Sequence, residues 1–186
     1  MTVAGNLGSG TVEDAFCQRA KEIKDGVIKD ADALSSTIEP IVPNDPAFEE
    51  LFRNFSVTKN KLARYMLQSL ERQERGEEEP ELVVNSDPDE VNLEHVLPQN
   101  PGTNWPAVSP ELAAVFACRL GNMVLLRKSE NESLGNGDFA SKRPVLSASS
   151  LQLTKTVGAE AGWGPEQIRE RQSKLAKLAV RVWALR

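Results

Sequence analysis

The sequence contains one histidine, two cysteines and no long hydrophobic run. A transmembrane helix needs roughly 18 or more consecutive apolar residues, so a membrane is not expected as a partner. The first residues lack the basic and apolar segments of a signal peptide. Cys17 and Cys118 form no C-x-x-C pair, which argues against a structural zinc site and a disulfide scaffold. The expected location is therefore the reducing cytoplasm.

The length of 186 residues allows one domain with its own core, extended by helices. Residues 1–10 are small, polar and rich in glycine, which predicts a flexible tail or linker. Residues 11–75 carry apolar side chains at helical spacing and predict a helical N-terminal part. Residues 76–186 contain the polar residues of the candidate site that is described below. We expect them to form a core domain that ends in a C-terminal helix.

The net charge of −5 is unevenly distributed along the chain. Residues 1–118 carry 10 Lys or Arg and 21 Asp or Glu, whereas residues 119–186 carry 12 Lys or Arg and 6 Asp or Glu. A basic C-terminal half is typical of a phosphate-binding face. A solvated helix face explains the same charge without any ligand, so charge alone does not decide between the two interpretations.

Helical spacing and helix breakers predict the individual elements. The predicted helices begin near Thr11 and cover 48–55, 59–75, 110–120, 138–142, part of 147–158, and the chain from 164 onward. Gly121 is expected to end the helix before it, and Pro144 to close the short helix at 138–142. Residues 123–126 form a continuous apolar run and are predicted to be a strand.

The only histidine, His95, follows Glu94 and precedes Pro98. Neighbouring side chains point to opposite faces of a regular strand. Glu94 and His95 can therefore serve one site only where a strand ends or bulges. Pro98 disfavours a continuing strand, so we predict that Glu94 and His95 lie at a strand end.

Hydrolysis of a phosphodiester needs a base, a cation and groups that hold the reactants in line. His95 suits the base, because its unperturbed pKa of about 6.5 leaves it largely neutral at cellular pH. Glu94 and Asn131 offer oxygen atoms to a hard cation such as Mg²⁺. Asn122 can hold the loop that carries His95 through backbone hydrogen bonds, and Lys142 can bind a phosphate as a point charge.

The run Glu94–Pro98 resembles the opening of HNH nucleases, which are also called ββα-metal or His-Me finger nucleases. In that group two asparagines, or an asparagine and a histidine, are separated by nine residues, as are Asn122 and Asn131. The larger pattern is similar to the C-terminal nuclease domain of GmrSD-type, modification-dependent restriction systems. Besides 94–99, this likeness includes the runs 120–126 and 139–142 and the C-terminal segment 163–183.

The resemblance implies an α+β, mostly helical fold, in which a short antiparallel hairpin and a helix form a ββα-metal core surrounded by further helices. It implies His95 as the general base, Asn122 as the positioning residue, and Glu94 and Asn131 as ligands of Mg²⁺ or Mn²⁺. Asn136 lies close to Asn131 in the sequence and is the alternative ligand. The basic residues expected at the DNA are Arg127, Lys128, Lys142 and Arg143.

The expected function is that of a metal-dependent DNA endonuclease, the effector domain of a bacterial restriction or phage-defence system. The resemblance also implies an N-terminal nucleotide-dependent sensor domain or subunit, for which this chain shows no counterpart. A catalytically inactive module of the same fold that binds DNA or a partner is the first alternative. A helical interaction domain without a metal is the second alternative.

Overall fold

The structure is a computed structural model that describes residues 9–76, 90–132, 134, 135 and 137–184. The chain divides into two compact units, Met1–Asn54 and Phe55–Arg186. Most of the expected tail at 1–10 lies outside the described residues, and the first helix already begins at Ser9. In the described parts of the chain, no helix has the combined length and hydropathy that crossing a bilayer requires.

The first unit consists of short helices. It contains α1 (Ser9–Lys24), α2 (Ala31–Ile38), the 3-10 turn η1 (Glu39–Ile41) and α3 (Asp45–Asn54). The predicted helices near Thr11 and at 48–55 are confirmed by α1 and α3. Helix α2 was not predicted, although the side chain of Asp30 caps it by accepting a hydrogen bond of 2.8 Å from the Ala33 N–H. An aspartate at this position is a recognisable start signal for a helix.

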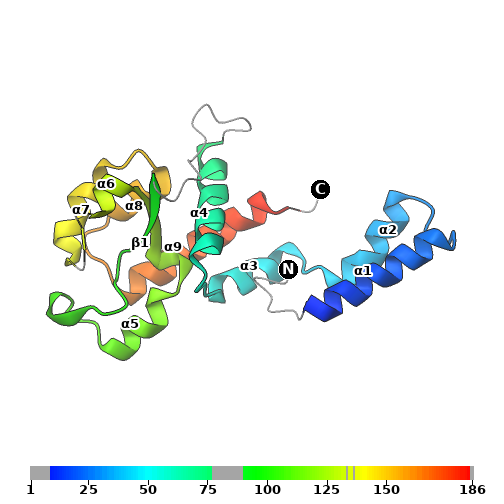
Figure 1. Ribbon diagram of the computed structural model, residues 1–186, viewed down its shortest axis with the longest axis horizontal. Coiled ribbons are helices and arrows are strands. Elements are labelled where there is room, and N and C mark those ends of the chain that lie inside the picture. The colour runs from blue at the N-terminus through cyan, green and yellow to red at the C-terminus, as the bar shows by residue number, and fades with distance from the viewer. Residues whose placement is uncertain (1–8, 77–89, 133, 136, 185–186) are drawn as a thin grey trace. The chain divides into compact units, whose positions relative to one another are not determined.

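The second unit contains a hairpin surrounded by helices. Its elements are α4 (Asn60–Arg75), β1 (Val91–His95), η2 (Gly102–Asn104), α5 (Pro110–Ala117), η3 (Leu120–Asn122), β2 (Met123–Arg127), α6 (Lys128–Glu132), α7 (Phe139–Ala148), α8 (Gln152–Gly158) and α9 (Pro165–Val182). The expected α+β, mostly helical class is confirmed. Within this unit the hairpin lies between α4 on one side and α6, α7 and α8 on the other (Figure 1).

Strands β1 and β2 pair antiparallel, with Glu94 opposite Val124 and His95 opposite Met123. His95 is the last residue of β1, which confirms the predicted strand end. Residues 123–126 are all buried, because helices cover both faces of this two-stranded sheet, and this explains their continuous apolar run. Helix α6 follows β2 directly, whereas η2, α5 and η3 lie between the two strands.

Helix α4 belongs to the hairpin unit, although the expected boundary lay after Arg75. Its buried face includes Met66, Leu67 and Leu70, and it packs against β2, α8 and α9. The buried carboxylate of Glu71 accepts hydrogen bonds from the first backbone N–H groups of α8, at Gln152 (2.6 Å) and Leu153 (2.8 Å). These contacts join α4 to elements that follow the hairpin, and the two compact units therefore separate before α4.

Two local predictions were wrong. Pro144 does not close the helix after Asp138, because α7 continues to Ala148 with Pro144 inside it. The proline removes one backbone donor, but the following turn buries Leu146 completely in the core. Gly121 does not end α5, which stops at Ala117. A Cβ atom on Gly121 would lie 2.5 Å from the carbonyl oxygen of Ile168, so glycine is needed there for close packing against α9.

Candidate active site

The buried lysine Lys142 of α7 ties the end of β1 in place. Its Nζ lies 2.5 Å from Oε1 of Glu94 and donates a second hydrogen bond of 3.1 Å to the backbone carbonyl of His95. The Lys142 side chain is 1% exposed and that of Glu94 is 14% exposed. Charge-assisted bonds of this kind are short and strong. Glu94 and the backbone of His95 are thus held by one ammonium group.

The same surroundings shift the pKa values of both residues. Burial raises the pKa of the Glu94 carboxyl, and the hydrogen bond and charge of Lys142 oppose that rise. Burial also lowers the pKa of His95, and the positive charge of Lys142 lowers it further. His95 therefore stays neutral to a lower pH than an ordinary histidine, which is the state that a proton acceptor needs.

Asn122 fixes the turn that follows His95. Its Oδ1 accepts hydrogen bonds from the Leu97 N–H (2.9 Å) and from the Trp163 Nε1–H (3.1 Å), while its Nδ2 donates to the Leu97 carbonyl (2.8 Å). The backbone carbonyl of Asn122 also accepts from the Val96 N–H at 3.0 Å. Asn122 is fully buried. The predicted hydrogen bonds between this residue and the loop after His95 are therefore present.

Helix α9 in turn holds the segment that carries Asn122. Nη1 of Arg171 donates to the carbonyl oxygens of Gly121 and Met123, each at 2.8 Å. The Gly121 N–H donates to Oε1 of Gln172 at 2.5 Å. Burial lowers the pKa of Arg171 to about 10. The supporting roles of Trp163, Arg171 and Gln172 were not predicted, because they depend on how α9 packs against a distant turn.

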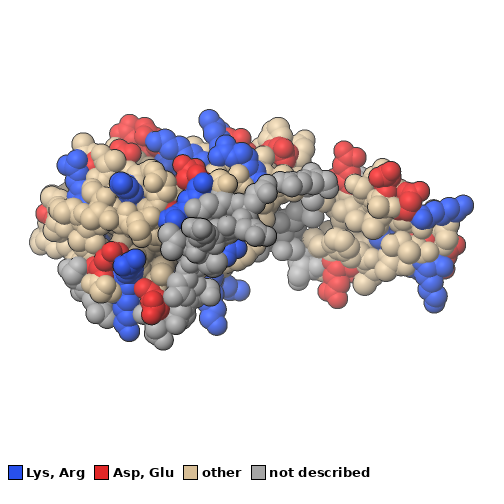
Figure 2. Space-filling model, turned by 90° about the horizontal axis from the view of Figure 1, so that it is seen from above, with Lys and Arg blue, Asp and Glu red and all other residues tan. Residues whose placement is uncertain are grey.

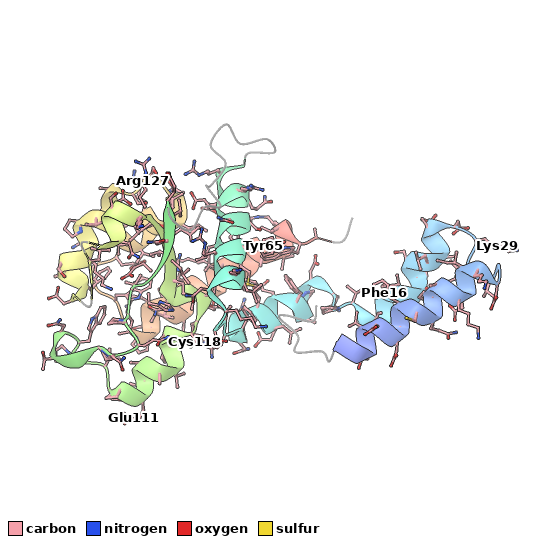
Figure 3. The ribbon with its side chains drawn as sticks, in the orientation of Figure 1. Phe16, Lys29, Tyr65, Glu111, Cys118 and Arg127 are labelled. Atoms are coloured by element: carbon pink, nitrogen blue, oxygen red, sulfur yellow. The ribbon has the colours of Figure 1, made fainter. Side chains whose placement is uncertain are left out.

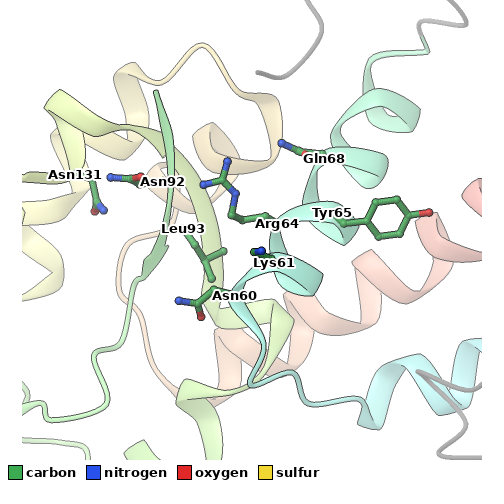
Figure 4. A pocket seen from close by; sticks show the side chains of 8 residues that line it. All are labelled: Asn60, Lys61, Arg64, Tyr65, Gln68, Asn92, Leu93 and Asn131. Atoms are coloured by element: carbon green, nitrogen blue, oxygen red, sulfur yellow. The ribbon is translucent and has the colours of Figure 1, made fainter. Parts of the chain in front are cut away.

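Asn131 lies in α6 and has an unusual side-chain oxygen. Its Oδ1 is buried and accepts no hydrogen bond from the described residues. A buried polar atom without a partner is rare and calls for an explanation such as a bound ion. Figure 4 shows the side chains of Asn131 and of Asn92, on β1, close to one another. The alternative ligand Asn136 lies outside the described residues.

The side-chain oxygens of Glu94 and Asn131 are of the type that a hard cation prefers. Mg²⁺ prefers oxygen ligands, keeps several waters and often uses only one or two carboxylates. Glu94 supplies a carboxylate with about four acceptor positions, of which Lys142 occupies one. Asn131 supplies the buried amide oxygen that has no partner among the described residues. Among the described residues there is no group of three or more His, Cys, Asp or Glu side chains that could hold a metal, so the fit depends on these oxygens.

The basic residues expected at the DNA divide into two groups. Arg127, Lys128 and Arg143 are exposed, and Figure 3 shows Arg127 near the outer end of the hairpin. Lys142 is buried and bonded within the protein, so it cannot reach a phosphate at the surface in this structure. Figure 2 shows a face on which cationic and anionic side chains are mixed. Charge alone therefore does not mark a DNA-binding surface on that face.

One known protein family matches the segment that contains His95, Asn122 and Asn131. Residues 42–178 match the family model described as GmrSD restriction endonucleases, C-terminal domain. The match covers more than half of the chain, and the chain belongs to this family. No curated protein matches it. Membership identifies the class as a restriction-endonuclease effector domain, with DNA as its substrate.

Proposed function

We propose that this domain is a metal-dependent DNA endonuclease of the HNH type. His95 is the general base, and Glu94 and Asn131 are the ligands of Mg²⁺ or Mn²⁺. The observation that carries the proposal is the buried Oδ1 of Asn131, which has no partner among the described residues and lies on the helix that follows the hairpin. The domain would act in the cytoplasm within a restriction or phage-defence system, together with an N-terminal nucleotide-dependent sensor.

Each residue has a defined task in the proposed reaction. Neutral His95 accepts a proton from the attacking water. Asn122 fixes the turn that follows His95, and Lys142 holds the Glu94 carboxylate and the His95 backbone in their positions. When bound, the divalent cation supplies a positive charge that stabilises the phosphoryl group and the leaving oxygen. The chain thus provides the base, the oxygen ligands and the supports that keep them in place.

Metal removal tests this proposal. We expect the protein to nick or cut plasmid DNA with Mg²⁺ or Mn²⁺, and to lose that activity completely in EDTA. Asn131→Ala should raise the Mg²⁺ concentration needed for half-maximal cleavage by roughly 10-fold or more, because it removes an oxygen ligand. Asn131→Asp keeps an oxygen at the same position and serves as the matched control. Cleavage that persists in EDTA, or an unchanged Mg²⁺ requirement in Asn131→Ala, would contradict the proposal.

One observation favours the alternative of an inactive module that binds DNA or a partner. The Glu94 carboxylate already has a cationic partner in Lys142, so its charge is compensated without a metal. A structural ion pair of this kind would keep the hairpin folded whether or not the site is active. Binding of DNA without cleavage under any divalent metal would support this alternative.

A further inference from the structure

We infer that the cavity between α4 and β1 is a binding subsite for a nucleotide of the DNA strand, with its phosphate held by Lys61 and Arg64. The inference rests on the proposed nuclease function and names an additional element, α4, that contacts the substrate. The cavity has a volume of about 540 Å³. Its lining residues are Asn60, Lys61, Arg64, Tyr65, Gln68, Asn92, Leu93 and Asn131.

The lining chemistry suits a phosphate. Of the lining residues that the structure describes, two are cationic, none is anionic, and four are amides that can donate to phosphate or sugar oxygens. Arg64 offers a planar fork of donors that matches phosphate oxygens, and Lys61 adds a point charge. Figure 4 shows Arg64 extending from α4 toward β1, whereas the Tyr65 ring points away from the hairpin. The volume lies within the range of small-ligand sites, about 300–1,000 Å³, and thus exceeds what a bare phosphate requires.

The position of the cavity connects it to the proposed metal centre. One of its lining residues is Asn131, the proposed ligand, whose buried Oδ1 is not hydrogen-bonded to any part of the chain that the structure describes. Asn92 and Leu93 of β1 also line it, whereas Glu94 and His95 are not among its described lining residues. Asn131 is therefore the residue that the cavity shares with the proposed metal centre, and we expect a nucleotide bound here to lie next to the scissile phosphodiester on the same strand.

A second cavity differs from this one in the charge of its lining residues, and this difference bears on which of the two can bind a phosphate. Beside α9 lies a cavity of about 310 Å³ whose lining includes Glu74 and Glu160 next to its lysines and arginines. Anionic side chains there oppose a phosphate, whereas the described lining of the cavity beside Asn131 includes none. The lysine and arginine of α4 come from the acidic N-terminal half of the chain, so the distribution of charge along the sequence does not identify them.

DNA affinity in EDTA tests the inference without requiring cleavage. The full chain would be titrated against a fluorescent duplex and against a single strand, with fluorescence anisotropy as the readout. Lys61→Gln combined with Arg64→Gln should weaken binding by roughly 10- to 100-fold, because charge-assisted contacts to phosphate are lost. The slope of log affinity against log salt should fall by about one to two, since each phosphate contact contributes about 0.9.

A matched control removes two charges elsewhere. Lys29→Gln combined with Lys155→Gln changes two exposed lysines outside the cavity. Lys29 lies in the loop after α1, and Lys155 lies in α8. It should leave affinity and salt slope close to wild type. If the combined cavity variant shows an altered circular dichroism spectrum, Lys61→Gln alone provides the test, because the Lys61 side chain is exposed. Its expected loss is about 10-fold in affinity.

The outcomes separate the two proposals. Equal affinities and salt slopes in the cavity variant and the matched control would overturn the subsite, even if wild-type protein cuts DNA with Mg²⁺. Weakened binding in the cavity variant alone supports the subsite. A wild-type protein that binds DNA through Lys61 and Arg64 but never cuts it would refute only the nuclease proposal.

Discussion

Replacement of His95 with alanine should reduce DNA cleavage by roughly 10²- to 10⁴-fold, the usual contribution of a general base. The variant should still fold, because the hydrogen bond between Lys142 and residue 95 uses the backbone carbonyl, which alanine keeps. The measurement is the single-turnover rate of plasmid nicking at saturating Mg²⁺, with circular dichroism as the check on folding.

The pH profile gives the same prediction a second readout. The base form of His95 is required, and burial together with the charge of Lys142 lowers its pKa below the ordinary value near 6.5. Wild-type cleavage should therefore persist as pH falls through 6.5 and decline only at lower pH. That acidic decline should be absent from the residual activity of His95→Ala. A variant that retains the wild-type rate and pH profile would exclude His95 as the base.

Replacement of Lys142 with methionine should be the most destabilising single change near the site. It leaves the Glu94 carboxylate without its cationic partner and the His95 carbonyl without its donor. Breaking a buried ion pair by removing one partner costs about 3–5 kcal/mol. The measurement is the free energy of unfolding from urea denaturation near neutral pH.

Two further variants show whether the loss of stability comes from breaking the buried ion pair or from removing any cationic residue of α7. Arg143→Met alters the next residue of α7, which is exposed and donates one hydrogen bond of 3.2 Å to the Gly158 carbonyl, and should cost about 1 kcal/mol. Adding Glu94→Gln to Lys142→Met removes the unpaired charge and should recover part of the loss. Because burial raises the pKa of Glu94 and Lys142 opposes that rise, the carboxyl of the single variant protonates more readily. The penalty should therefore shrink as pH falls toward 4. Equal stability of Lys142→Met and Arg143→Met would contradict the role of Lys142.

Local sequence signals predicted the centre of the fold. The strand end at His95 and the strand at 123–126 follow from short-range spacing and from a proline three residues after the histidine. These two features depend on neighbouring residues in the chain, so they could be predicted before the packing of the helices was known. The hydrogen bonds between Asn122 and Leu97 join residues 25 positions apart, and the site chemistry and the family resemblance suggested them.

Long-range packing produced the features that the sequence did not reveal. Lys142 has the expected residue type, but its partner Glu94 lies 48 residues earlier, and the packing of α7 against the hairpin buries it. Lys61 and Arg64 lie in the acidic half, and only the packing of α4 beside β1 brings them near Asn131. Pro144 is tolerated within α7 because the core on the other side of the helix holds the next turn.

The most direct test of the central claim is the position of a bound Mn²⁺ ion in crystals of this domain, located by its anomalous scattering. We expect one strong peak bonded to Oδ1 of Asn131 and to the Glu94 carboxylate, next to the strand end that carries His95. A protein saturated with Mn²⁺ that shows no peak at these oxygens, or a peak only at other residues, would contradict the proposed metal centre.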